Sequence, residues 1–350
     1  TNIMSTPARK RISMIGPIMP PAGGVSVHIE RLTHLLTNDF DVQLIDESRV
    51  KKPGILNIRN FNFFGYLKAL AKSDIVHIHS GTRSLKYAHI LISRLMGKKT
   101  VLTIHFLKNC DTKLKVKMDG WMYSLPHLTI PVAKDITERI ALTNNAVVKD
   151  AFLPPVLETE PPIPEELVNW MASKKAAGYQ IAVANAWRLD HYKGKDRYGL
   201  DICIAAFDRL KKEGKKVCLV YVVSDLGGEI DIKIYEDQIA TLGLSEVLYL
   251  RKKQVSFVNL VRQADVVLRP TNADGDALTV REALILGKSV IASDAVPRPA
   301  GSIIFKNRDA DSLAEMISGY LAGQNREVRA NAGAVADYGK FYKEVYSNLS

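Results

Sequence analysis

The sequence predicts an α/β protein with two doubly wound parallel sheets, one in each half of the chain. Short apolar runs typical of buried parallel strands alternate with longer stretches of helical periodicity in both halves. A proline-rich, acidic segment at 154–164 interrupts this alternation, which resumes at Gln180. A chain of 350 residues is long enough for two domains that each bury a core.

The expected elements follow this alternation. Strands are predicted at 11–17, 42–46, 75–79, 100–105, 127–132, 180–184, 217–223, 247–250, 265–268 and 289–293. Helices are predicted at 25–38, 84–97, 199–213, 231–242 and 338–349, together with one after Asp274. The expected organisation is a first domain at 1–155, a linker at 156–178, a second domain at 179–335 and a terminal segment at 336–350.

One segment carries the strongest chemical signal. Asp274-Gly-Asp-Ala-Leu-Thr-Val-Arg-Glu282 follows a buried strand, with the glycine in a loop and Glu282 in the helix after it. Such a loop turns backbone N–H groups toward an anion, and the helix dipole favours negative charge there. A carboxylate on each side suits a ligand with phosphate in the middle and sugar hydroxyls at both ends. This pattern indicates a nucleotide sugar.

A second motif lies upstream, where Arg188 and Lys193 stand five apart after a strand in Ala-Asn-Ala-Trp-Arg-Leu-Asp-His-Tyr-Lys-Gly. The two motifs resemble the G-R-L-x-x-x-K-G and E-x7-E motifs of the retaining GT-B glycosyltransferases of family 4 (glycosyl transferases group 1). Asp274 stands where that family has Glu, and Trp187 where it has Gly. The resemblance implies a GT-B fold, with two Rossmann-like domains that face a central cleft and a C-terminal helix at 336–350 that packs back on the first domain.

The resemblance also implies roles for individual residues. The cations at Arg188 and Lys193 would hold the donor diphosphate, Glu282 the ribose hydroxyls, and Asp274 the donor sugar, a task that Asp276 would share. The catalytic residues implied are Arg188, Lys193, Asp274 and His105. The donor-binding residues implied are Gly23, Gly24, Arg188, Lys193, Arg251, Asp274, Gly275, Asp276, Ala277, Leu278, Thr279 and Glu282.

Several of these residues also have ordinary structural readings. Gly23 and Gly24 are either a tight turn or a loop that lets backbone approach a ligand. His105, which ends a strand, is either a structural histidine or a contact to the donor sugar, and His77 and His79 share that ambiguity. Arg269, unusual beside a buried strand, has Asp274 or Asp276 as candidate partners.

Charge is unevenly distributed along the chain. Residues 1–155 hold about 22 Lys and Arg against about 11 Asp and Glu, and the remainder is balanced. This excess predicts either solubility or attraction to an anionic membrane surface or lipid-diphosphate acceptor. The basic residues form no recognisable nucleic-acid module. The polar, basic start lacks a signal peptide, so we expect a cytoplasmic protein, or one peripheral on the inner face of the membrane.

The function expected is that of a retaining hexosyltransferase. It would move a sugar from a nucleotide-diphosphate donor, a UDP-sugar, to a glycan or lipid-linked acceptor in bacterial surface polysaccharide synthesis. No cofactor and no metal is expected; Cys110, Cys203 and Cys218 are odd in number and widely spaced, which predicts reduced thiols and no zinc site. The alternatives are a GT-B sugar-nucleotide 2-epimerase and a catalytically degenerate GT-B regulatory subunit.

Overall fold

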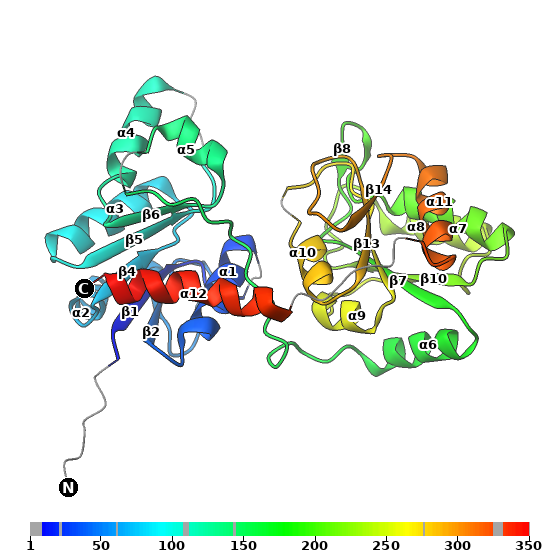
Figure 1. The fold of residues 1–350 in the computed structure, drawn as a ribbon, viewed down its shortest axis with the longest axis horizontal. Coiled ribbons are helices and arrows are strands. Elements are labelled where there is room, and N and C mark those ends of the chain that lie inside the picture. Colours follow the sequence, from blue (N-terminus) through cyan, green and yellow to red (C-terminus); the bar gives the residue numbers. More distant parts are fainter. Residues whose placement is uncertain are drawn as a thin grey trace, which may run out of the picture. The chain divides into compact units, whose positions relative to one another are not determined.

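The structure is a computed structural model that describes residues 9–20, 23–60, 62–107, 112–142, 145–275, 277–324 and 332–349. The chain divides into two compact units, Thr1–Pro154 with Ala336–Ser350, and Pro155–Val335. Each unit contains a parallel sheet flanked by helices, so the predicted α/β class with two doubly wound sheets is confirmed (Figure 1). None of the helices in these ranges has the length and apolar composition of a membrane span.

The first unit is built on a six-stranded sheet of order β3-β2-β1-β4-β5-β6, with all neighbours parallel. Every residue of β4 is buried, as expected for an inner strand covered by helices on both faces. The elements are β1 (Arg11–Gly16), α1 (Gly24–Leu36), β2 (Asp41–Asp46), β3 (Leu56–Asn57), a 3-10 turn (Ile58–Asn60), α2 (Phe63–Ala71), β4 (Ile75–Ile78), α3 (Arg83–Leu95), β5 (Lys99–Ile104), α4 (Lys113–Tyr123), β6 (Leu128–Pro131) and α5 (Lys134–Ile140).

The two faces of this sheet carry separate cores. On one face, α1 packs with α12 (Ala332–Asn348), and Leu32, Tyr342 and Tyr346 are buried together. On the other face, α2 to α5 bury residues such as Tyr66 and Tyr123. The helix α12 follows the second unit in the sequence but belongs to the first, where Lys10 Nζ donates to the carbonyl of Tyr346 at 3.2 Å.

The second unit has a six-stranded parallel sheet of order β11-β10-β7-β12-β13-β14 and a small β8-β9 hairpin. All seven residues of β10 are buried in a single core with the flanking helices. The elements are α6 (Glu165–Ala176), β7 (Gln180–Ala186), β8 (His191–Tyr192), β9 (Lys195–Asp196), α7 (Leu200–Lys212), β10 (Val217–Val223), α8 (Ile232–Thr241), β11 (Leu248–Arg251), α9 (Phe257–Gln263), β12 (Val266–Arg269), α10 (Leu278–Ile285), β13 (Ser289–Ser293), β14 (Ser302–Phe305) and α11 (Ala310–Leu321).

The segment 156–178, expected as a linker, contains the helix α6. Two acidic residues in its first turn favour the helix start, and Leu167 and Met171 are buried in the core of the second unit. The proline-rich composition therefore marks only the stretch before Glu165. Cys203 and Cys218 are buried free thiols, whereas Cys110 lies outside the described residues.

Candidate functional site

Both sheets contain a point at which the direction of strand addition reverses. β1 lies between β2 and β4, and β7 lies between β10 and β12. In open α/β sheets, ligands bind beyond the carboxyl ends of the strands at such a point. In the second unit, the residues that follow β7 and β12 are Arg188 and Asp274, which the two sequence motifs contribute. The topology therefore brings the two motifs to one edge of the sheet.

Lys193 is presented by the turn of the β8-β9 hairpin. The two strands pair antiparallel, and both turn residues have left-handed backbone, with φ of 51° at Lys193 and 71° at Gly194. The lysine side chain is exposed, and its Nζ lies 5.4 Å from the centre of the Tyr192 ring. A cation held at the tip of a hairpin is accessible to an anionic ligand.

Asp196, which the sequence analysis did not identify, fixes the base of this hairpin. Its carboxylate is buried and accepts from the backbone N–H groups of Tyr198, Gly199 and Leu200 at 2.8, 3.1 and 3.0 Å. The Tyr235 hydroxyl donates to it as well, at 2.8 Å, while burial raises the pKa of the carboxyl. The sequence signal for this role is an Asp placed just before a helix start.

The hairpin is also tied to the loop that follows β12. Asn272 donates from its side chain to the carbonyl of Tyr192 at 3.1 Å and from its backbone N–H to the carbonyl of Arg197 at 2.7 Å. Because Asn272 lies two residues before Asp274, these bonds join the lysine motif directly to the acidic motif.

Arg188 follows β7 and faces a carboxylate at the end of the neighbouring strand. Its Nη2 lies 3.4 Å from Asp225 Oδ2, and both side chains are more than a third exposed. Such a long, solvated pair contributes little stability, so an anionic ligand can replace it at small cost. Trp187, which precedes Arg188, is 44% exposed.

Asp274 is held by protein groups on both oxygens. Arg269 donates to it from Nε and Nη2, each at 2.8 Å, Arg298 from Nη1 at 2.8 Å, and Thr271 from its hydroxyl at 3.0 Å. Burial alone would raise the pKa of this carboxyl, but the hydrogen bonds and charges of the two arginines lower it to about 2. The side chain is 7% exposed, which indicates that Asp274 positions the loop.

The helix α10 begins just beyond this loop, and the side chain of its N-cap residue makes no hydrogen bond to the first turn. Its N-cap residue is Ala277, and Gly275 in the loop is exposed. The first N–H groups of a helix are suited to phosphate oxygens. Leu278 is half-buried, and Thr279 and Glu282 are buried on this helix. Asp276, predicted to share sugar binding, lies outside the described residues.

Arg251 is not gathered with these groups. It ends β11, the edge strand, which β10 separates from β7. Its guanidinium forms an ion pair with Glu166 of α6, so it ties that helix to the sheet. Binding of a nucleotide base by Arg251 stays a prediction.

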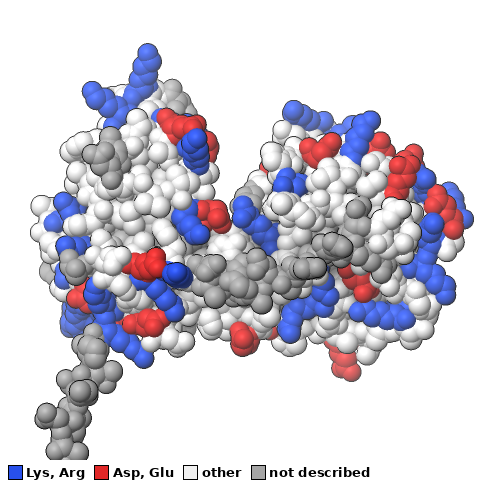
Figure 2. All heavy atoms as spheres, in the orientation of Figure 1, with Lys and Arg blue, Asp and Glu red and all other residues white. Residues whose placement is uncertain are grey.

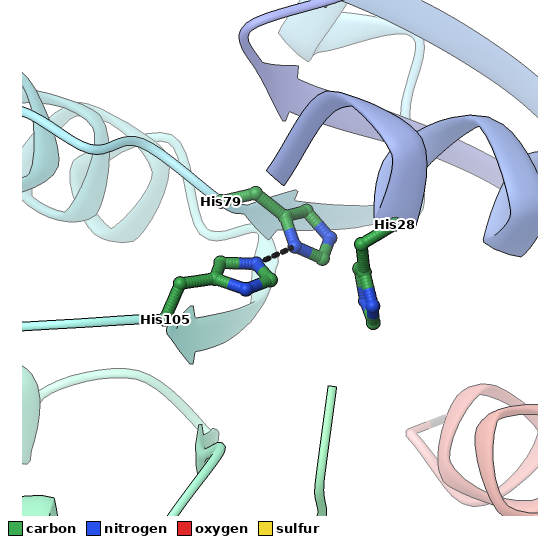
Figure 3. A group of neighbouring side chains, drawn as sticks. All are labelled: His28, His79 and His105. Carbon is green, nitrogen blue, oxygen red and sulfur yellow. Dashed lines mark hydrogen bonds between the residues drawn. The ribbon is translucent and has the colours of Figure 1, made fainter. Parts of the chain in front are cut away.

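In the first unit, three histidines gather at the carboxyl ends of β4 and β5. His28 comes from α1, His79 follows β4 and His105 follows β5, and their ring centres lie 4.9–5.4 Å apart (Figure 3). His79 Nδ1 and His105 Nε2 are 3.2 Å apart and share a hydrogen bond. His28 was not identified from the sequence, although it lies one helical turn after Gly24.

Burial lowers the pKa of all three imidazoles, that of His28 to about 4. Neutral rings offer both a donor and an acceptor nitrogen, which suits sugar hydroxyls. The carbonyl of Ala151 accepts from His28 Nδ1 at 2.7 Å, so His28 Nε2 carries a lone pair. Ring nitrogens of the three residues lie within 4.8 Å of one another, so this set could also hold a metal ion. His77 is buried beside them and hydrogen-bonded to Tyr346 and Thr103.

Gly23 and Gly24 lie after β1, at the start of α1. Neither has positive φ, and a Cβ on either would meet no atom of the described residues closer than 3.8 Å. Packing against the described part of the chain therefore does not require glycine at either position. In the second unit, a hollow of about 390 Å³ is lined by residues 294–298, which include Arg298, and by Ile304.

No protein-family model matches this sequence, and neither does any curated protein. Solved structures do match over nearly the whole chain. HepE of Anabaena in complex with UDP-glucose is 13% identical, with a TM-score of 0.65 and coverage of 96% of this chain and 99% of that chain. A glycosyltransferase from Rickettsia africae is 16% identical, with a TM-score of 0.68 and coverage of 97% and 99%.

A third similar structure is trehalose-6-phosphate synthase OtsA from E. coli. The form bound with UDP-2-fluoro glucose is 16% identical, with a TM-score of 0.62 and coverage of 97% of this chain and 99% of that chain. At this level of identity the likeness establishes the fold. The α/β fold of this chain is that of the GT-B glycosyltransferases.

Proposed function

We propose that this protein is a retaining glycosyltransferase that moves a sugar from a UDP-sugar to a glycan or lipid-linked acceptor. The observation that supports the proposal is the strand order, in which the accessible cations Arg188 and Lys193 follow β7 and the start of α10 follows the neighbouring strand β12 at one reversal point. The similar structures of HepE with UDP-glucose and OtsA with UDP-2-fluoro glucose support a nucleotide-sugar donor.

The proposed chemistry assigns each group a separate task. Arg188, Lys193 and the first N–H groups of α10 stabilise the negative charge that develops on the diphosphate as the anomeric carbon–oxygen bond breaks. Glu282 accepts from ribose hydroxyls. The acceptor oxygen bonds to the anomeric carbon on the same face, and its proton passes to the departing phosphate oxygen. The protein cations supply the positive charge, so we propose a transfer that needs no metal.

The acceptor side is assigned to the first unit. Glycine at positions 23 and 24, which packing against the described residues does not require, and neutral imidazoles at His79 and His105 suit hydroxyl-bearing ligands. The net positive charge of residues 1–155 suits an acceptor carried on an anionic lipid at the inner membrane face, as in bacterial surface polysaccharide synthesis.

One observation favours a second candidate, a GT-B regulatory subunit without catalysis. The family's first glutamate is Asp274 here, and its carboxylate is occupied by Arg269 and Arg298. A subunit of that kind would bind the nucleotide without turning it over. A 2-epimerase would instead convert the UDP-sugar in the absence of any acceptor.

Calorimetry with UDP, GDP and ADP, followed by NMR analysis of products from UDP-sugars, tests these readings. We expect UDP to bind and the sugar to appear on an acceptor with its anomeric configuration kept. Nucleotide binding without turnover would support the regulatory subunit. No binding of any nucleoside diphosphate at millimolar concentration would refute the glycosyltransferase.

A further inference from the structure

The outward face of α4 is made of large apolar side chains and lysines. Leu114, Met118 and Trp121 follow one another at helical spacing and are 70%, 45% and 64% exposed. Lys113 and Lys117 are exposed beside them. Single exposed apolar residues are ordinary on protein surfaces, but three on one helical stripe form a contiguous patch.

The opposite face of α4 is firmly held. Arg83 donates to Asp119 from Nε at 3.0 Å and from Nη2 at 2.8 Å, and the Tyr87 hydroxyl donates to Asp119 at 2.6 Å. Met122 and Tyr123 are buried in the core that this helix shares with α2, α3 and α5. The apolar stripe therefore cannot turn inward without breaking a buried ion pair and emptying part of the core.

The charged side chains on the outward face of α4 are basic. Asp119 is the acidic residue of α4, and it points inward to its arginine. Basic side chains project from the end of the first unit that carries α4, and acidic side chains lie on one flank of that end (Figures 1 and 2). A face that is apolar along one stripe and positive along the next complements a surface with anionic groups above an apolar layer, which describes the interface of an anionic bilayer.

We propose that α4 docks flat on an anionic membrane, with Trp121, Leu114 and Met118 in the boundary between headgroups and acyl chains. Lys113 and Lys117 contact lipid phosphates. Tryptophan at such a boundary keeps its ring in the apolar layer and its N–H near the headgroups. This inference rests on the proposed function, in which the first unit binds the acceptor at the membrane. It adds shallow insertion of the apolar side chains of α4 to the ionic attraction between the basic first unit and anionic lipid.

Vesicle co-sedimentation with the full chain tests this docking. We expect binding to vesicles of phosphatidylcholine with phosphatidylglycerol, and much weaker binding to phosphatidylcholine alone. The Leu114→Ser/Met118→Ser/Trp121→Ser variant should bind at least about tenfold more weakly, because three apolar side chains no longer leave water. Lys113→Gln/Lys117→Gln should lose about fivefold per lysine at low salt and little at 0.5 M salt.

The matched control is Phe64→Ser/Leu95→Ser/Ile234→Ser, which removes three well-exposed apolar residues from α2, α3 and α8. It should bind like the wild type. Trp121→Phe should keep binding but lose the blue shift of tryptophan fluorescence that vesicles cause. Circular dichroism of each variant confirms folding.

Two results would overturn the proposal. Equal loss of binding in the α4 variant and the control variant would mean that the stripe has no special role, as would no vesicle binding by the wild type. Self-association by ultracentrifugation that the α4 variant abolishes, without vesicle binding, would make the stripe an interface between copies. UDP binding measured without lipid is independent of both results, so failure of the docking and failure of the transferase function remain distinguishable.

Discussion

Asp274 and Lys193 belong to the same region of the second unit but differ in what surrounds them. The carboxylate of Asp274 is almost fully buried and accepts from two arginines, whereas the ammonium group of Lys193 projects from an exposed hairpin turn. Buried charges that lose their partners are costly, while exposed lysines contribute little to folding. Substitutions at the two positions should therefore affect different properties.

Lys193→Ala should reduce turnover about a hundredfold or more, because a positioned cation at a developing charge is worth about 3–4 kcal/mol in the transition state. Its free energy of unfolding should change by no more than about 0.5 kcal/mol. Lys195→Ala is the matched control, since this exposed lysine lies in the same hairpin. Steady-state kinetics and urea denaturation provide both readouts; similar turnover in the two variants would remove the role proposed for Lys193.

Asp274→Asn should lower the free energy of unfolding at neutral pH by about 3–5 kcal/mol, because it leaves Arg269 and Arg298 without their counter-charge. The folded-state pKa, about 2, lies below the ordinary value of 3.8, so this stabilisation is present above pH 4 and is lost as pH falls toward 2. Urea denaturation across this range should show the gap between variant and wild type closing.

Asp311→Asn controls for charge removal, since Asp311 is exposed and pairs with Arg209 at the surface. It should cost no more than about 1 kcal/mol. A loss of the same size in both variants would contradict the structural role assigned to Asp274.

Local motifs predicted the candidate site only where its members are close in sequence. Arg188 and Lys193 were identified together, as were Asp274 and Glu282, because each pair belongs to one strand-loop-helix stretch. Arg298 was not, since it reaches Asp274 from beyond β13 and only the folded sheet brings them together. Arg269 was predicted only in part. Its charge beside a buried strand indicated an acidic partner, with Asp274 or Asp276 as candidates, and in the structure Arg269 donates to Asp274.

At the scale of elements, helices were predicted correctly where only one face of the helix is apolar. Helices expected at 25–38, 84–97, 199–213 and 231–242 are confirmed by α1, α3, α7 and α8, with ends shifted by at most two residues. The helix α4 was missed because Leu114 and Trp121 on its outer face and Tyr123 on its inner face leave no clear period. The strands β8 and β9 have two residues each and carry no periodic signal.

The histidines contributed by α1, β4 and β5 should make stability depend on pH. Burial lowers the folded-state pKa of His28, His79 and His105 below the ordinary value of 6.5, so the unfolded chain binds more protons in acid. Their stabilisation is complete above pH 6.5 and is lost as pH falls below it. The steepest slope that each can contribute is about 1.4 kcal/mol per pH unit, reached where the unfolded imidazole is protonated and the folded one is neutral.

Urea denaturation of His105→Gln at several pH values measures this slope. The variant should show a shallower fall than the wild type, by about one histidine's share. His34→Gln, at an exposed position of α1, should leave the slope unchanged. Identical slopes in all three proteins would mean that the buried cluster does not govern acid stability.

At the scale of the whole molecule, the two compact units do not simply follow one another along the chain, because the first unit contains segments from both ends of it. The first unit includes α12, from the far end of the sequence, which packs into the core on one face of its sheet. The second unit has a core of its own, formed by residues between the two parts of the first. The excess of positive charge in residues 1–155 therefore belongs to the unit that is built from the two end segments of the chain.

Two compact units predict two unfolding transitions in calorimetry, one for each unit. Tyr346 is fully buried in the first unit, with its hydroxyl 2.5 Å from His77 Nδ1, so Tyr346→Ala should lower that unit's free energy of unfolding by about 3–5 kcal/mol. One transition should move down by several degrees and the other should stay, because α12 contributes to only one core. Tyr320→Ala is the reciprocal control, since Tyr320 is buried on α11 in the second unit. It should shift the other transition alone, whereas a single transition displaced by both substitutions would show that the units unfold together.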